Sequence, residues 1–286
     1  MIVHDWFIHS LFAVTAISGM MALFKVPTAK GHNKFLYSFL SFATASIFSF
    51  IFFRSFINLD SRTMLFGLVW GIGYALLVLL QMEILRNLDT NAVFPITSTA
   101  SNVITLIIGL LFFHDKINLL QFIGVFLAVF VIAFYNQKYK HITFQNGLLV
   151  GFGSIVLLST FTKFIQKFGA ISVETENFIF WQLFFATLAS LVILGITMRN
   201  ELGRQFKVSK NVVAWATTLG ALNFIGTTEI VRALSTGPFS LVYTINGFYI
   251  LITSLIAWKL FGEKLTRHKV IFLFTAVIAV ILIGLK

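Results

Sequence analysis

The charged residues of this sequence divide it into ten long apolar segments, and this division constrains the fold more than any other feature. The segments span residues 6–24, 35–53, 63–82, 90–114, 117–137, 141–162, 177–198, 211–228, 233–258 and 270–285. A helix needs about 20 residues to cross a bilayer, and a charge at the bilayer centre costs about 2.5–3.5 kcal/mol. Only the last segment is short for a span. We therefore predict an all-α integral membrane protein with ten transmembrane helices.

The composition supports the same class of protein. Of the 286 residues, 58% are apolar and only 11% are charged, which is too little charge to cover a water-soluble globule. Residues 119–134 are apolar on all sides apart from Gln121 near the start and do not alternate in polarity, so helices are favoured over barrel strands. The absence of cysteine excludes disulfides, thiolate metal ligands and a thiol nucleophile.

The surplus of basic residues does not indicate nucleic-acid binding. The chain has 21 Lys and Arg against 10 Asp and Glu, but the basic residues are spread between the apolar segments instead of forming one patch. The loops after the odd-numbered segments carry about twice as many basic residues as the other loops and the termini. By the positive-inside rule, this bias places both termini outside.

An internal repeat is the most informative motif in the chain. Residues 83–90 (EILRNLDT) align without gaps on residues 229–236 (EIVRALST), and five of the eight positions are identical. Each copy precedes a long apolar helix that closes on a similar turn, residues 113–117 (FHDKI) and 261–265 (FGEKL). Two matches in the same order, at nearly the same offset, indicate a duplication of five helices. The predicted repeats are residues 1–140 and residues 141–286.

The odd number of helices in each repeat has a geometric consequence. The sixth helix must enter the membrane from the face opposite to the first, so the second repeat is inverted relative to the first. Inverted repeats are typical of secondary transporters, in which the substrate site lies near the bilayer midplane between the repeats. The duplication therefore predicts function as well as ancestry.

Several residues of the two repeats also match a known pattern. They are Pro95, Gln121 and Gly124 in the spacing Gln-x-x-Gly, residues 234–238 (LSTGP) and residues 262–265 (GEKL). With these motifs, residues 83–135 and 229–284 resemble the drug/metabolite transporter superfamily, in particular its ten-helix EamA-like branch. The remaining helices agree in number and length. The resemblance implies a multi-pass transporter of the plasma (inner) membrane without a cofactor, and it leaves a homodimer open.

The sequence departs from the family pattern in two places. His114-Asp115 replaces the usual Gly-Glu pair, and Ser18-Gly19 stands where Trp-Gly is common. The second departure falls on a helix that lines the cavity in that family, so no relative's substrate is transferred to this chain. The resemblance also implies cytoplasmic termini, opposite to the charge count, and the orientation stays open.

Two acidic residues lie closest to the membrane interior and are candidate gate residues. Glu83 and Glu229 fall about one turn inside the ends of their helices, and each has an arginine three positions on, Arg86 and Arg232. Inversion would place the two pairs at opposite membrane faces, where they could open and close a cavity. The alternative is that they are ion pairs that only end helices.

Polar side chains within the apolar segments are the candidates for a substrate cavity. One helix presents Ser98, Ser101, Asn102 and Thr105 on one face, and its repeat counterpart presents Tyr243, Asn246 and Tyr249. Tyr74, Gln81 and Asn223 form a second tier. The alternative is that these polar side chains only make packing contacts and hydrogen bonds between helices. Pro95 lies inside its segment and is a candidate hinge.

No catalytic or metal-binding motif is present in the sequence. The histidines have no ligand spacing, and no nucleophile elbow or phosphate loop occurs. We predict a secondary transporter, with a small-molecule substrate and the lipid bilayer as its partners, that moves a polar or amphipathic metabolite by alternating access. Amino acids and nucleotide-type solutes are examples. The alternative is an intramembrane enzyme or a component of a lipid-headgroup flippase. Substrate, coupling ion and direction stay open.

Overall fold

A computed structural model describes residues 5–86, 88, 90–134, 146–199, 210–262 and 267–285. All regular structure within these ranges is helical, as predicted. The helices are α1 (Asp5–Leu23), α2 (Val26–Ala29), α3 (Lys34–Phe53), α4 (Ser61–Ile84), α5 (Thr90–Leu111), α6 (Leu119–Phe134), α7 (Asn146–Ser172), α8 (Thr175–Met198), α9 (Lys210–Thr236), α10 (Phe239–Asn246), α11 (Tyr249–Phe261) and α12 (Arg267–Gly284).

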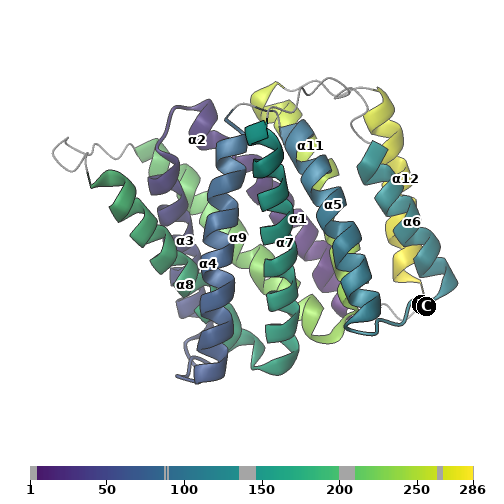
Figure 1. The fold of residues 1–286 in the computed structure, drawn as a ribbon, viewed down its shortest axis with the longest axis horizontal. Coiled ribbons are helices and arrows are strands. Elements are labelled where there is room, and N and C mark those ends of the chain that lie inside the picture. The colour runs from purple at the N-terminus through teal and green to yellow at the C-terminus, as the bar shows by residue number, and fades with distance from the viewer. Residues whose placement is uncertain are drawn as a thin grey trace.

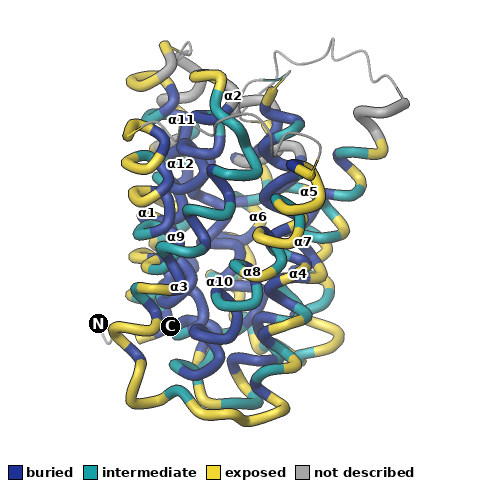
Figure 2. The backbone as a smooth tube through the Cα atoms, turned by 90° about the vertical axis from the view of Figure 1, so that its left-hand side faces the viewer, coloured by how far each residue is buried: buried dark blue, intermediate teal, exposed yellow. Residues whose placement is uncertain are grey.

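The long helices run up and down through one bundle, with α8 near one edge and the pair α6 and α12 at the other (Figure 1). We call the end at which α1 begins and α12 finishes the lower end, as drawn in Figures 1 and 2. There Gly284 lies against Phe7, and Gly237 lies against Trp6. At the upper end, the Tyr37 hydroxyl donates to the Leu23 carbonyl at 3.2 Å. Both termini of the described chain therefore lie at the lower end.

The outside of the bundle is apolar, as expected for contact with lipid. Large hydrophobic side chains stay exposed along it, among them Phe52, Leu59, Phe126 and Phe274, each at least 65% exposed. Figure 2 shows buried residues concentrated along the inner faces of the helices. Five helical stretches of the described chain are long and apolar enough to cross a membrane: Asp5–Leu23, Lys34–Phe53, Ser61–Ile84, Thr175–Met198 and Phe239–Leu260. The chain is a multi-pass membrane protein by class, and ten spans stay a prediction.

Two helices continue past the boundaries that the charge-free segments predict. The segment ending at residue 162 is part of α7, which runs on to Ser172 and includes Lys163 and Lys167. The segment ending at residue 228 is part of α9, which reaches Thr236 through Glu229 and Arg232. The boundaries were wrong because a charged side chain ends an apolar run in sequence but not a helix, provided that it finds polar partners.

Residues with the expected capping chemistry set several helix ends. The Asn33 side chain accepts hydrogen bonds from the backbone N–H groups of Phe35 and Leu36 and caps α3. Asp60 accepts in the same way from Arg62 and Thr63 and caps α4. Caps of this kind satisfy amide groups that the first turn of a helix leaves unpaired.

Two repeat-related turns share an uncommon backbone conformation. His114 follows α5 with φ of 53°, and Gly262 follows α11 with φ of 68°. Both lie in the left-handed region, which helices commonly use at their C-termini. These residues occupy matching places in the aligned turns FHDKI and FGEKL.

The two halves of the chain pack into each other and do not form separate lobes. Helices α1 and α3 of the first half both pack on α9 of the second half. Likewise, α7 and α8 of the second half both pack on α4 of the first half. Helices α3 and α8 also meet, as do α6 and α12. Exchanging each helix for its counterpart in the other predicted repeat leaves these contacts largely unchanged.

The predicted ninth span is interrupted, whereas the span with the candidate hinge is not. Helix α5 continues through Pro95 without a break. Its counterpart is divided into α10 and α11 by a turn at Gly247 and Phe248, where the Phe248 N–H donates to the Ile245 carbonyl at 3.0 Å. This i→i+3 bond tightens the helix locally, and such turns inside long helices often mark a hinge. Pro95 was the hinge predicted from the sequence, and Gly247 was not singled out.

Candidate functional site

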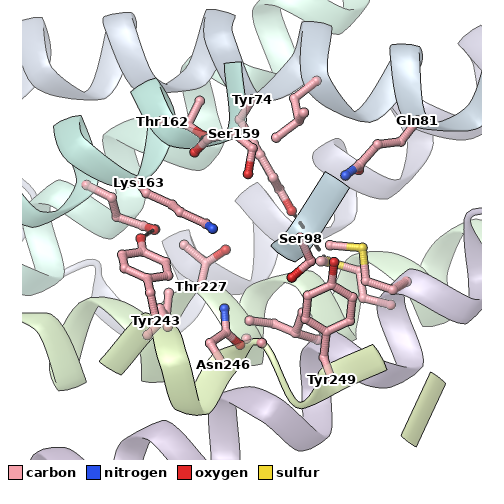
Figure 3. A pocket seen from close by; sticks show the side chains of 18 of the residues that line it. Tyr74, Gln81, Ser98, Ser159, Thr162, Lys163, Thr227, Tyr243, Asn246 and Tyr249 are labelled. Atoms are coloured by element: carbon pink, nitrogen blue, oxygen red, sulfur yellow. Dashed lines mark hydrogen bonds between the residues drawn. The ribbon is translucent and has the colours of Figure 1, made fainter. Parts of the chain in front are cut away.

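A cavity lies in the middle of the bundle, between helices of both halves. It holds about 780 Å³ of space that no protein atom occupies, including its open mouth. Side chains from α1, α4, α5, α7, α9, α10 and α11 line it. The apolar part of the wall includes Ile17, Met20, Trp70, Leu77 and Ile155. Polar groups converge on the cavity from the same helices (Figure 3).

Lys163 of α7 is the only charged residue among the described residues that line the cavity. Its ammonium donates to the Ser101 hydroxyl and to the side-chain amide oxygen (Oδ1) of Asn102, each at 2.8 Å. It also lies 5.1 Å from the centre of the Tyr243 ring, within cation–π range. These partners are neutral, and no ion pair recorded among the described residues includes Lys163. The described wall of the cavity therefore presents one basic side chain and no carboxylate.

Two residues of the cavity wall have an amide oxygen without a hydrogen-bond partner among the described residues. They are Gln81 (Oε1) and Asn246 (Oδ1), with side chains that are 5% and 9% exposed. Buried polar atoms are normally satisfied, because an unpaired acceptor costs about 1–3 kcal/mol. Each of these residues thus brings an incompletely satisfied amide group to the cavity wall.

Other polar side chains of the wall are tied to one another across helices. The hydroxyl of Tyr74 lies 3.3 Å from Oδ1 of Asn223, which also accepts from Thr227 at 3.2 Å. The hydroxyl of Tyr243 donates to Oε1 of Gln166 at 2.8 Å. These bonds join α4 to α9 and α10 to α7, so they hold the walls of the cavity in place.

Most of the polar residues selected from the sequence meet around this cavity. Those that line it are Ser98, Asn102, Tyr243, Asn246, Tyr249, Tyr74, Gln81 and Asn223. Ser101 and Thr105 do not line it. Ser101 lies behind the wall, where it joins Lys163 to Ser159 and Thr160 of α7, and Thr105 bonds back to the Ser101 carbonyl at 2.7 Å. These two small hydroxyls serve packing between α5 and α7, which is the alternative considered above.

Sequence reasoning missed Lys163 and the contributions of α1 and α7. Lys163 was read as the end of an apolar segment, because the segments were defined by the absence of charge. The missed signal is the i, i+4 spacing of Lys163 and Lys167 in an otherwise apolar run, which places both on one helical face. Charged residues inside a membrane helix usually face the bundle interior and mark functional sites.

Lys167 faces the lower end of the bundle and does not line the cavity. Its ammonium donates to the carbonyls of Leu234 and Gly237 at 2.7 and 3.0 Å, at the C-terminus of α9. Nearby, the Asp115 carboxylate accepts from the backbone N–H and the hydroxyl of Ser240 at 2.7 and 2.6 Å, at the start of α10. A cation thus caps the end of one helix and an anion caps the start of the next, as the helix dipole favours.

The candidate gate residues form ion pairs at opposite ends of the bundle. The predicted i, i+3 contacts are present, because Arg86–Glu83 and Arg232–Glu229 each measure 3.5 Å. At the upper end Glu83 also pairs with Lys34 of α3. At the lower end Glu229 lies 2.6 Å from His9 of α1, and Arg232 pairs with Glu176 of α8 at 3.5 Å. The cavity extends between these clusters, from Gln81 near Glu83 to Ile230 next to Glu229.

The described residues include no group of three or more His, Cys, Asp or Glu side chains that could hold a metal ion. The candidate catalytic sets that an intramembrane enzyme needs are likewise not assembled around the cavity, whose described wall contains no carboxylate and no histidine.

Comparisons with known proteins agree with this architecture. Residues 145–285 match the model of the EamA-like transporter family. No curated protein matches the sequence closely enough to serve as a relative. Twenty-eight chains of solved structures match the fold. One of them, described only as the crystal structure of a protein, has a TM-score of 0.74 at 10% identity, with 97% of this chain and 95% of that chain covered.

At 10% identity the solved structure shows a shared fold alone, over nearly the full length of both chains. The family match adds the class of activity, because members of this family carry small molecules across membranes and are not enzymes. It covers the helices from α7 to α12. The apolar helices and the central cavity agree with this match, which identifies the second half of the chain, residues 145–285, as a region of the EamA-like transporter family, part of the drug/metabolite transporter superfamily.

Proposed function

We propose that this protein is a secondary transporter that moves a small polar or amphipathic metabolite by alternating access through the central cavity. The observation that carries the proposal is the position of the cavity, which lies between the two halves and is flanked at each end by ion pairs. A site between repeats, open to each side in turn, is the general arrangement of secondary transporters.

The packing of the helices supports an inverted duplication. The counterpart contacts α1 with α9 and α7 with α4, together with the shared left-handed turns at His114 and Gly262, are those that a repeated unit would produce. The paired segments 83–90 and 229–236 then lie at the two membrane faces. An inverted pair of units can exchange conformations, so that one unit opens while the other closes.

The ion pairs at the two ends are the gates in this proposal. Each joins helices that must separate for the cavity to open at that end: α3 and α4 through Lys34 and Glu83, and α1 and α9 through His9 and Glu229. Breaking such a pair costs free energy that the contacts at the other end, once formed, would offset. The interrupted helix α10–α11 lies beside the cavity and offers a point of bending at Gly247.

The direct test is solute flux in liposomes that contain only this protein. We expect saturable uptake or counterflow of a metabolite that stabilises the purified protein in a thermal-shift screen, since a ligand that binds the folded state raises its melting temperature. Replacing Asn246 with Leu should weaken that stabilisation. Movement of lipid between leaflets, or product formation without solute flux, would instead support the flippase or enzyme alternative.

A further inference from the structure

We propose that the substrate is a singly charged organic anion whose anionic group binds Lys163. This inference rests on the proposed function, because it names the class of molecule that the transport cavity accepts. It goes beyond the family match, which identifies no substrate. Three observations at the cavity wall carry it.

The first observation is the uncompensated charge of Lys163. A buried ammonium without a counter-charge is costly, and hydrogen bonds to neutral oxygens offset only part of that cost. Ser101 and Asn102 accept two of its three N–H donors, and the third faces no described carboxylate of the wall. A bound carboxylate or phosphate-type oxygen would complete this set with a charge-assisted hydrogen bond.

The second observation is that one charge lines the cavity, so one negative charge balances it. The remaining wall around Lys163 consists of neutral polar, aromatic and aliphatic side chains. A second negative charge on the ligand would have no cation to face in the described wall. The electrostatics of the cavity therefore favour a monoanion over a dianion, and both over a cation.

The third observation is a pair of polar amides in the same wall. Gln81 and Asn246 come from α4 and α10, and Figure 3 shows both side chains around the same space as Lys163. Their amide groups can form hydrogen bonds with a polar group of the ligand. The wall also includes Trp70 and Tyr249, which suit an apolar or aromatic body. A ligand with an anionic group, an apolar body and a second, hydrogen-bonding group satisfies all three features.

A matched pair of probes tests the charge requirement. The probes are 3-(4-hydroxyphenyl)propionate and its primary amide, which share a body and a donor and differ in charge. We expect the carboxylate to raise the melting temperature of the wild-type protein and to bind about tenfold or more tightly than the amide, because its anionic oxygens pair with Lys163. Equal binding of the two probes, or no binding of the carboxylate, would overturn the proposal.

Three variants assign the effect to Lys163. Lys163→Gln should lose the preference for the carboxylate, and Lys163→Arg, which keeps the charge, should retain it in part. Lys167→Gln is the matched control, because Lys167 is a buried lysine one turn away on the same helix that bonds to α9 carbonyls instead of lining the cavity. A carboxylate preference that survives Lys163→Gln would show that Lys163 only links α5 to α7 and would refute the inference.

Two further experiments identify the type of anionic group and test the proposed transport function separately from the substrate class. Methyl phenyl phosphate, a singly charged phosphate diester, tests a phosphate-type anion with the same set of variants, and stronger binding than the carboxylate would assign the group to a phosphate. Counterflow in proteoliposomes then distinguishes the two proposals. Flux of neutral solutes with no anion preference would refute the substrate class alone, whereas anion binding without any solute flux would refute transport and leave the Lys163 site in place.

Discussion

At the scale of single residues, two lysines one turn apart on α7 have different roles. Lys163 faces the cavity, and Lys167 caps the C-terminus of α9. Eight of the polar residues predicted from the sequence line the cavity, but neither lysine was among the candidates. Amides and hydroxyls could be selected because a polar residue in an apolar helix needs a partner. Charged residues could not be selected in this way, because charge was also the signal used to end each apolar segment.

Removal of the Lys167 cap should destabilise the protein. In Lys167→Met the carbonyls of Leu234 and Gly237 lose their donor, and Asp115 loses a nearby positive charge. We expect a loss of about 1–3 kcal/mol, the usual cost of leaving a buried polar group unpaired, seen as a lower melting temperature in detergent. Lys167→Arg, which keeps donors and charge, should recover part of the loss. An unchanged melting temperature in Lys167→Met would exclude this capping role.

The left-handed turns at His114 and Gly262 allow a paired test of backbone strain. His114→Gly should stabilise the protein and Gly262→Ala should destabilise it, each by about 1 kcal/mol, because a Cβ atom is unfavourable at positive φ. His114 is exposed, and a Cβ at Gly262 would meet no atom within 4 Å, so packing does not obscure either effect. Thermal unfolding of the two variants measures these changes in stability. A stabilising Gly262→Ala would contradict the assigned conformation.

At the scale of helices, the sequence predicted the existence of the long elements better than their ends. The first three spans agree closely with α1, α3 and α4, because caps and charged loops coincide there. The limits of α7 and α9 differ because their charged residues find partners in neighbouring helices: Lys167 in the α9 carbonyls, and Glu229 in His9. The turn at Gly247 contains no proline that would indicate it in the sequence, and its position depends on packing against other helices.

Close helix contacts at glycine should control how the bundle assembles. A Cβ added at Gly220 of α9 would overlap the Ser41 carbonyl oxygen of α3, which backbone movement alone can relieve. We expect Gly220→Ala to cost about 1–3 kcal/mol, as overpacking does. Gly153 and Gly195 are matched controls in α7 and α8, where an added Cβ meets nothing within 4 Å. Their alanine variants should be neutral or slightly more stable, since alanine is the better helix former.

Equal melting temperatures for Gly220→Ala and the two control variants would contradict the close approach of α3 and α9. A loss of stability in the controls as well would point to a general intolerance of substitution, and not to the packing at Gly220. Circular dichroism at the helical bands during heating gives the comparison for all three variants.

At the scale of the whole molecule, membrane class and helical fold follow from hydrophobicity, because only satisfied backbones cross a bilayer. The internal repeat predicts how the two halves are related, but the way in which they interlock cannot be read from it. Packing of α1 on α9 and α7 on α4 brings residues of both halves to one cavity. Such long-range contacts depend on the shape of whole helix faces, which no local motif specifies.

The most direct test of this account is the accessibility of single cysteines, since the chain contains no native cysteine to interfere. Arg86→Cys at the upper end should react with a membrane-impermeant thiol reagent from one side of the membrane only, and Thr236→Cys at the lower end from the other side only. Ser159→Cys in the cavity should react from both sides, because alternating access exposes it to each in turn. Reaction of the Arg86 and Thr236 variants from the same side would contradict the inverted arrangement on which the proposed transport cycle rests.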